Sequence, residues 1–419
     1  MHPSSRRLLL LLSVLSALAL PAQAEPDEQA LGKSQGYPIG SSLSNWANMG
    51  YRVGSWSALD KVPGVLTTPV KPAATPLALP KAANAPAIRY RHRNFGYSLD
   101  EYLERQRITG LLILKNGEIV AERYRYGRTE DARFLSFSMA KSVTSLLIGI
   151  AVSKGTIQSL DDTAASYVKE LAGSAYGETK IRHLLRMSSG LRFTERYDGQ
   201  DDVARLSYSV ARGQPSVLTV LRSISDRQAP AGEKFVYASA ETEVLGRVLT
   251  AATGRSLAEL TTEWLWQPMG AENNAFWRTS TDGQEVAYAY FNASLRDWGR
   301  LGLLLANDGK LGAQQVVPRE YLLDATDAAR QSAAFAPYRA TPGFGYGYQF
   351  WLHPLHERSF GMQGVHGQAV FMQPASGIVM VQTAVYAGAN GVQDPDAYAE
   401  RASFWLGVLQ SLGGSTERY

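Results

Sequence analysis

The stretch that decides the fold is FLSFSMAKSVTSLLIGIAVSKG, residues 134–155. Between Ser138 and Lys154 the side chains are apolar or small on nearly every side of the helix that this run would form. Gly155 follows at the position where such a helix is expected to end. A helix that is apolar all round has to be buried, so we predict that this segment is the central helix of a domain.

The segments on either side of this helix predict the fold class. Residues 108–126 read as two strands joined by Asn116-Gly117, a strong hairpin signal, and residues 156–330 read as mostly helical. After residue 330, short β-rich runs are separated by Gly, Pro or Ser, and an amphipathic helix over 396–412 closes the chain. We therefore predict an α+β fold: an antiparallel sheet built from the N- and C-terminal parts and flanked by helices, with a mainly helical second lobe and a cleft between them.

The first residues read as a secretory signal peptide over 1–24. Arg6 and Arg7 supply the positive start, an apolar run follows, and Ala22-Gln23-Ala24 supplies a small-residue cleavage site. The alternative is an uncleaved membrane anchor, but the apolar run is short for a bilayer. We expect export to the periplasm or the medium, with no stable membrane anchor after cleavage.

Two further regions follow the signal peptide. Residues 25–95 are rich in Pro and Ala without periodicity, and we expect an irregular extension or linker, with ordered structure starting near Ser98. We expect residues 96–415 to form the main domain, with the helical lobe of approximately 156–330 inserted into it.

Composition excludes several classes of function. The 419 residues carry a net charge of +4, too small for a nucleic-acid-binding footprint, and contain no cysteine. Thiol nucleophiles, disulfide scaffolds and thiolate metal sites are therefore excluded. The six histidines are scattered, so we expect neither a metal nor a cofactor. The chemistry must use hydroxyls, amines and carboxylates.

The central helix opens with an S-x-x-K motif, Ser138-Met139-Ala140-Lys141. This spacing places the lysine one helical turn after the serine, within reach of its hydroxyl. Burial and the positive helix N-terminus both favour a neutral lysine, which can then act as the base for a serine nucleophile. A second copy, Ser166-Tyr167-Val168-Lys169, lies in a surface-type amphipathic segment, and we interpret it as a chance match.

Two further motifs have features that suit this chemistry. Tyr237-Ala238-Ser239 precedes a predicted helix, and its phenol can relay a proton beside Ser138 if a nearby lysine lowers its pKa. The alternative is a buried tyrosine with a satisfied hydroxyl. Gly364-Val365-His366 lies between two β-rich runs, where a strand edge can aim a backbone N–H at an oxyanion alongside that of Ser138. Gly364 permits the close approach.

In this order and at these distances, the motifs resemble those of the serine β-lactamase and penicillin-binding protein superfamily. Within this superfamily, the chain resembles the class C-like branch, which includes family VIII carboxylesterases and 6-aminohexanoate-dimer hydrolases. The resemblance covers roughly residues 95–415 and includes phrases such as IRHLLRMSSG and GYGYQFWL. It implies that Ser138 is the acylated nucleophile, Lys141 its general base and Tyr237 the tyrosine of the family's Y-x-N motif.

The resemblance also assigns residues around the nucleophile. Met362-Gln363-Gly364 takes the place of K-T-G, which makes the Val365 N–H the second oxyanion donor. A slip of two or three residues would instead place Ser359-Phe360-Gly361 there, or bring the His366 side chain into the site. Ser239 stands where β-lactamases keep Asn. Further tentative substrate-binding residues are Tyr197, Ser239, Asn292, Gly364 and His366.

The departures from the family pattern bear on function. The missing K-T-G lysine removes a cation that would hold a substrate carboxylate, and Ser239 replaces an amide. Both changes weaken the case for β-lactam or D-Ala-D-Ala recognition and fit the esterase and 6-aminohexanoate-dimer hydrolase branch better. We therefore expect an exported serine hydrolase that cleaves small amide or ester substrates through an acyl-enzyme on Ser138. The alternatives are a class C-type β-lactamase, a D-alanyl-D-alanine carboxypeptidase, or a catalytically silent binding protein. The sequence leaves the physiological substrate and the oligomeric state open.

Overall fold

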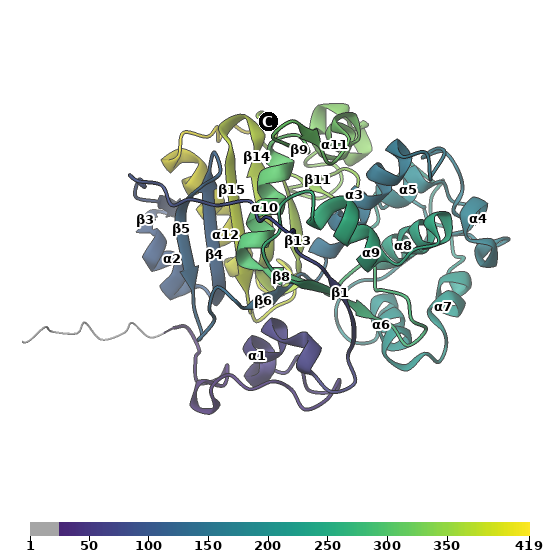
Figure 1. Cartoon of the computed structure of the whole chain (residues 1–419), viewed down its shortest axis with the longest axis horizontal. Coiled ribbons are helices and arrows are strands. Elements are labelled where there is room, and N and C mark those ends of the chain that lie inside the picture. Colours follow the sequence, from purple (N-terminus) through teal and green to yellow (C-terminus); the bar gives the residue numbers. More distant parts are fainter. Residues whose placement is uncertain (1–24) are drawn as a thin grey trace, which may run out of the picture.

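The computed structural model describes residues 25–419. The predicted signal peptide, residues 1–24, lies outside the described residues. The main sheet has seven antiparallel strands in the order β11-β12-β13-β14-β15-β4-β5 (Figure 1). Its strands are β4 (Ile108–Lys115), β5 (Glu118–Tyr124), β11 (Gly345–Tyr346), β12 (Trp351–Leu352), β13 (Phe360–Gly364), β14 (Gln368–Gln373) and β15 (Ile378–Ala384).

Alternating side chains on the central strands give this sheet two buried faces. On β4, Leu111 and Ile113 face one hydrophobic cluster, whereas Leu112 and Leu114 face another. Helices α2 (Leu99–Arg105) and α12 (Pro395–Ser411) pack on the first face. Helices α3 (Met139–Ser153) and α10 (Leu295–Ala306) pack on the second. The antiparallel sheet built from both ends of the domain is confirmed.

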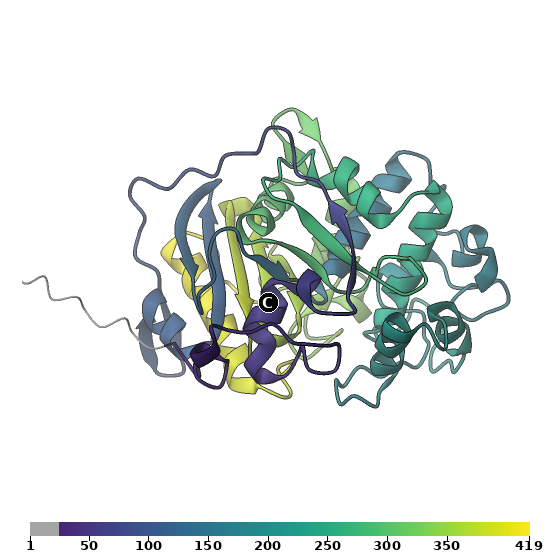
Figure 2. The ribbon, with the colours of Figure 1, turned by 60° about the horizontal axis from the view of Figure 1, so that its bottom comes forward.

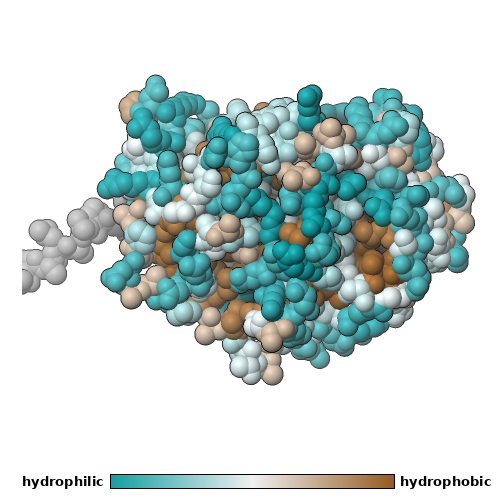
Figure 3. Space-filling view, turned by 90° about the horizontal axis from the view of Figure 1, so that it is seen from above, coloured by the Kyte–Doolittle hydropathy of each residue, from teal (hydrophilic) through white to brown (hydrophobic). Residues whose placement is uncertain are grey.

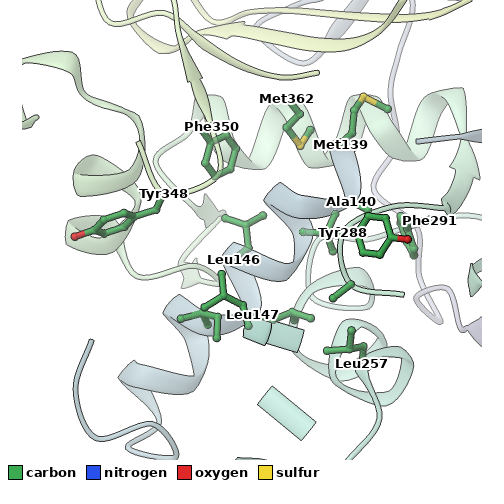
Figure 4. Close-up of a cluster of buried hydrophobic side chains, with 14 of the residues drawn as sticks. Met139, Ala140, Leu146, Leu147, Leu257, Tyr288, Phe291, Tyr348, Phe350 and Met362 are labelled. Atoms are coloured by element: carbon green, nitrogen blue, oxygen red, sulfur yellow. The ribbon is translucent and has the colours of Figure 1, made fainter. Parts of the chain in front are cut away.

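The central helix predicted from the sequence is α3. Thirteen of its fifteen residues are buried, from Met139 to Ala151. Figure 4 shows its side chains packed between Phe291, Tyr348, Phe350 and Met362, which come from segments on both sides of the helix. The helix therefore fills the space between the main sheet and the helical lobe.

The helical lobe is smaller than the predicted 156–330. Helix α10 lies within those limits but packs on the main sheet, because Gly299 and Gly302 let it come close: a Cβ at either position would lie 2.5 Å from a side-chain carbon of the sheet. The lobe contains α4 (Ala164–Tyr167), α5 (Ile181–Leu185), α6 (Asp202–Arg212), α7 (Val217–Ser223), α8 (Ser239–Thr253) and α9 (Leu257–Thr261). Helix α11 (Arg319–Thr326) and the short hairpin β9 (Lys310–Leu311) and β10 (Gln314–Gln315) follow.

Ordered structure begins well before Ser98, so that expectation was wrong. Helix α1 (Arg52–Ser57) buries Val53 and Trp56 beside the main body. Strand β1 (Leu66–Val70) is the edge of a second sheet, where its Pro69 is tolerated. That four-stranded sheet has the order β1-β7-β8-β6 and includes β7 (Ala275–Thr279), β8 (Phe291–Ser294) and β6 (Arg133–Leu135). A small hairpin, β2 (Arg89–His92) and β3 (Phe95–Ser98), follows.

The N-terminal segment, residues 25–65, extends along one side of the molecule, with α1 below β6 in Figure 1 and in front in Figure 2. Seen from above, hydrophilic residues cover most of the surface and hydrophobic ones form separate patches (Figure 3). Among residues 25–419, no helix is both long enough and apolar enough to cross a membrane.

Candidate active site

Ser138 lies at the point where β6 passes into α3. The preceding Ser136 is fixed to β8: its N–H donates to the Phe291 carbonyl at 2.8 Å, and its Oγ accepts from the Phe291 N–H at 3.0 Å. Phe137 then adopts a left-handed conformation, with φ of 43°. Ser138 follows as the N-cap residue of α3. The hydroxyl is thus presented at the end of a rigid, buried helix, as the motif predicts.

Lys141 is buried beside this hydroxyl, with 1% of its surface exposed. Its Nζ lies 2.9 Å from Ser138 Oγ and donates to the Tyr288 carbonyl at 3.0 Å. The rings of Tyr237 and Tyr288 flank it, with centroids 5.0 and 5.5 Å from Nζ. Burial lowers the pKa of Lys141 to about 8, although the negative charge of Glu195 opposes this shift. A neutral amine at this position can accept the Ser138 proton.

Tyr237 reaches the same point from the loop before α8. Its ring stacks on Trp351, with centroids 5.5 Å apart, and it lines one cavity together with Ser138. Burial, followed by the charge of Glu195, raises the pKa of Tyr237 well above 10, whereas its hydrogen bonding with Ser138 lowers it. The condition set for the proton relay, that a nearby lysine lowers this pKa, is therefore not met, because desolvation dominates. The phenol keeps its proton and can act as a donor.

Glu195 is a polar residue of the site that the sequence analysis missed. Its carboxylate accepts three hydrogen bonds, from the Ser239 N–H at 2.9 Å, the Ser239 hydroxyl at 2.8 Å and the Tyr197 hydroxyl at 2.7 Å. It lies at the positive end of α8, where a negative charge is stabilised. No local motif marks this residue, since Ser239 lies 44 positions further along the chain.

For the third motif, the structure agrees with the alignment that puts Met362-Gln363-Gly364 at the K-T-G position. Gln363, Gly364 and Val365, at the end of β13, line the cavity with Ser138. A Cβ on Gly364 would lie 2.3 Å from the Ser136 carbonyl oxygen, so only glycine allows β13 this close to the nucleophile. The alternative at Ser359 lies at the start of β13, where Ser359 is buried and its hydroxyl pairs with His353 Nδ1 at 2.7 Å.

Only some of the tentative substrate-binding residues line the cavity. Tyr197 lines the cavity. Ser239, Asn292 and His366 are not among its lining residues, so the structure does not support direct substrate contact by these three side chains. Ser239 holds Glu195 instead. Asn292 is buried within β8, where its Nδ2 donates to the Tyr290 carbonyl at 3.0 Å.

His366 does not line the cavity, and its Nδ1 donates to the Tyr386 carbonyl at 2.9 Å. Its ring packs on Trp56 and Phe137. Burial and the charge of Arg52 lower the pKa of His366 to about 4.

The cavity has a volume of about 700 Å³, and nine Phe, Tyr or Trp residues contribute to its walls. Phe235, Phe344 and Trp351 form much of the wall near Tyr237. A cation is present despite the missing K-T-G lysine: Arg401 of α12 lies in the wall. It is 2% exposed and donates to Gln363 Oε1 and to the Gln368 carbonyl.

No cluster of three or more His, Asp or Glu residues within residues 25–419 is arranged to hold a metal ion. The arrangement instead combines a hydroxyl, a buried amine with an accessible neutral form, and a protonated phenol. Such a set can activate an alcohol as a nucleophile and protonate a leaving group.

Comparisons with known proteins agree with this geometry. A family model described as "Beta-lactamase" matches residues 98–403. A 6-aminohexanoate-dimer hydrolase of Paenarthrobacter ureafaciens is 27% identical over 298 residues, which cover 68% of this chain and 74% of that protein.

Solved structures share the fold. A putative 6-aminohexanoate-dimer hydrolase from Bacillus anthracis matches with a TM-score of 0.79 and 24% identity, covering 89% of this chain and 97% of that one. A family VIII carboxylesterase matches with a TM-score of 0.52 and 17% identity, covering 71% and 93%.

Proposed function

Because the chain belongs to the beta-lactamase family and its relatives include hydrolases, we propose that it cleaves small amides or esters through an acyl-enzyme on Ser138. The observation that carries this proposal is the 2.9 Å contact between Ser138 Oγ and the buried Nζ of Lys141, whose pKa of about 8 makes the neutral amine accessible near neutral pH.

In the proposed first step, Ser138 Oγ attacks the substrate carbonyl carbon and its proton passes to Lys141 Nζ. The oxygen of the tetrahedral intermediate receives hydrogen bonds from the Ser138 and Val365 N–H groups. The Tyr237 phenol then protonates the leaving amine or alcohol as the bond to carbon breaks, and Lys141 returns the proton to Tyr237. In the second half, a water molecule attacks the acyl carbon and gives a proton to Lys141 Nζ. The bond between the acyl carbon and Ser138 Oγ then breaks, Tyr237 protonates Oγ, and Lys141 returns its proton to Tyr237, so that the acid product and free Ser138 are formed.

The cavity walls support a substrate with an extended apolar part. Aromatic side chains line much of the cavity, and Gln363 stands at the position where the K-T-G motif has threonine. One observation favours the alternative, a β-lactamase or carboxypeptidase that recognises a substrate carboxylate: the Arg401 guanidinium lies in the same wall. Against that alternative, Arg401 is almost fully buried and already donates to Gln363.

A substrate panel on the purified chain tests the proposal. We expect turnover of p-nitrophenyl esters or of 6-aminohexanoate dimer, and slow or no turnover of nitrocefin. Fast nitrocefin turnover without ester or amide cleavage would favour the β-lactamase alternative. A folded protein that a fluorophosphonate probe fails to label at Ser138 would contradict the acyl-enzyme.

A further inference from the structure

We infer that Trp56, in the N-terminal segment outside the family match, is a positioning residue for the oxyanion site. This inference rests on the proposed function, because it concerns the backbone N–H groups of Ser138 and Val365. Its indole packs on the residue before one donor and on the residue after the other.

The two oxyanion donors each adjoin a residue in a left-handed conformation. Phe137, with φ of 43°, precedes Ser138, and His366, with φ of 60°, follows Val365. Non-glycine residues adopt this conformation at an energetic cost and keep it only where the surroundings hold them. The direction of each donor's peptide plane therefore depends on contacts that prevent its neighbour from relaxing.

Trp56 supplies such contacts to both neighbours at once. Its ring lies 4.9 Å from that of Phe137 at 86°, an edge-to-face pair, and 5.0 Å from that of His366. The rings of Phe137 and His366 are themselves 5.8 Å apart. The indole is 5% exposed, and its Nε1 is buried without a hydrogen-bond partner within residues 25–419. Ring packing and the Arg52 guanidinium, whose Cζ lies 5.4 Å from the centre of the indole ring, therefore hold the indole in this cluster.

The helix that carries Trp56 is also anchored to the loop that holds His366. Arg52, at the start of α1, donates to the carbonyls of Tyr386 and Ala387 at 2.9 and 3.2 Å. Tyr386 in turn donates its N–H to the His366 carbonyl at 3.1 Å and accepts from the His366 ring. Helix α1 thus contacts both the residue before Ser138 and the loop that follows Val365.

Removal of the indole should allow Phe137 and His366 to relax and should misalign the two N–H groups. Misaligned donors weaken transition-state stabilisation. The aromatic wall formed by Phe235, Phe344 and Trp351 lies on other segments and does not involve Trp56, so ground-state binding should change little. The expected signature is a loss in kcat with a nearly unchanged KM.

The test compares three variants of the full chain: Trp56→Ala, Trp56→Phe and Leu59→Ala. Leu59 is fully buried in the same hydrophobic cluster as Trp56, so its truncation is a matched control for general loosening of the segment. Kinetics on a p-nitrophenyl ester, the rate of fluorophosphonate labelling and the thermal midpoint are measured. We expect Trp56→Ala to lower kcat and the labelling rate about tenfold to hundredfold, Trp56→Phe to recover most of both, and Leu59→Ala to lower only the thermal midpoint.

Three results would overturn the inference: an unchanged kcat in Trp56→Ala, a loss confined to KM, or an equal loss of kcat in Leu59→Ala. If Trp56→Ala does not fold, Trp56→Leu, which keeps an apolar side chain, carries the same test. Failure of the proposed function is separately visible, because the unmodified chain would then neither be labelled at Ser138 nor cleave the ester, and the inference would fall with it.

Discussion

The chain contains the tetrapeptide pattern S-x-x-K twice, and only one copy has the geometry of a nucleophile and its base. In the first, Lys141 Nζ reaches Ser138 Oγ at 2.9 Å inside the core. In the second, Ser166 and Lys169 are both exposed. There Lys169 Nζ donates to the backbone carbonyl of Ser166 at 2.8 Å, and the Ser166 hydroxyl pairs with that of Thr163.

The difference lies in the helix rather than in the motif. Helix α3 continues through Lys141 to Ser153, so serine and lysine are on one face. Helix α4 ends at Tyr167, and Lys169 belongs to a separate turn. The amphipathic helix expected around the second copy is thus only four residues long. Spacing brings the two groups together only where the helix is continuous, and chemistry follows only where burial changes the lysine pKa.

The largest expected effect is the loss of the nucleophile. Ser138→Ala should abolish fluorophosphonate labelling and lower kcat/KM by at least about 10³-fold, because the covalent route is removed. Ser166→Ala is the matched change in the second copy and should leave both unchanged. Steady-state kinetics and mass spectrometry of the labelled protein measure this pair. Equal losses in the two variants would contradict the assignment of the nucleophile.

The next effect concerns the base. Lys141→Met removes the amine but keeps an apolar side chain of similar length, and we expect kcat to fall by about 10²- to 10⁴-fold. The fold should remain intact, because replacing a buried charge by an apolar group is often neutral or stabilising. Near-wild-type kcat in this variant would show that another group deprotonates Ser138. Circular dichroism and thermal unfolding serve as the control for folding.

The parts of the fold and of the site that could be predicted from the sequence are those that depend on interactions between residues close together in the chain. The apolar run of residues 134–155 was enough to predict α3, because a helix that is buried on all sides requires a continuous run of apolar or small residues, which the sequence shows directly. The hairpin at Asn116-Gly117 was predictable for the same reason. Ser138 and Lys141 were found together since one helical turn separates them.

The missed features depend on contacts between distant segments. Glu195 meets Ser239 from a loop 44 positions earlier, and nothing near either residue indicates the other. The N-terminal segment has no periodicity, yet Trp56 is buried against Phe137 and His366. The direction of the Tyr237 pKa shift could not be predicted from the sequence either, because it depends on desolvation by the surrounding structure, which the spacing of motifs does not specify.

The pH dependence of the reaction tests whether burial of Lys141 distinguishes it from the exposed Lys169. If neutral Lys141 is the base, kcat/KM should rise about tenfold per pH unit below pH 8 and level off above it, because burial lowers the pKa of Lys141 to about 8. A rate that rises with no inflection up to pH 10 would contradict a lowered pKa at this residue.

The lowered pKa of Lys141 also makes the free energy of unfolding depend on pH. The direction of this dependence is opposite to that of a salt-bridged lysine, whose pKa is raised on folding. The folded-state pKa of about 8 lies below the ordinary value of 10.5. Between these values the unfolded chain holds a proton that the folded chain has released, so the free energy of unfolding should rise with pH across this window. Below pH 8 the penalty of burying the charge is fully present. Lys141→Met should lack this rise, which denaturant unfolding at pH 7.5 and pH 10 can measure against the unmodified chain.

The smallest effect is expected at the second lysine. Lys169 Nζ donates to the backbone carbonyls of Ala165 and Ser166 in α4. Because the side chain is exposed, water replaces these hydrogen bonds when the side chain is removed. Lys169→Ala should therefore lower the free energy of unfolding by at most about 0.5 kcal/mol and leave kcat and its pH profile unchanged. A denaturant titration beside the kinetic assay measures both. Because the motif is identical in the two copies, a clear loss of activity here would show that burial is not what separates them.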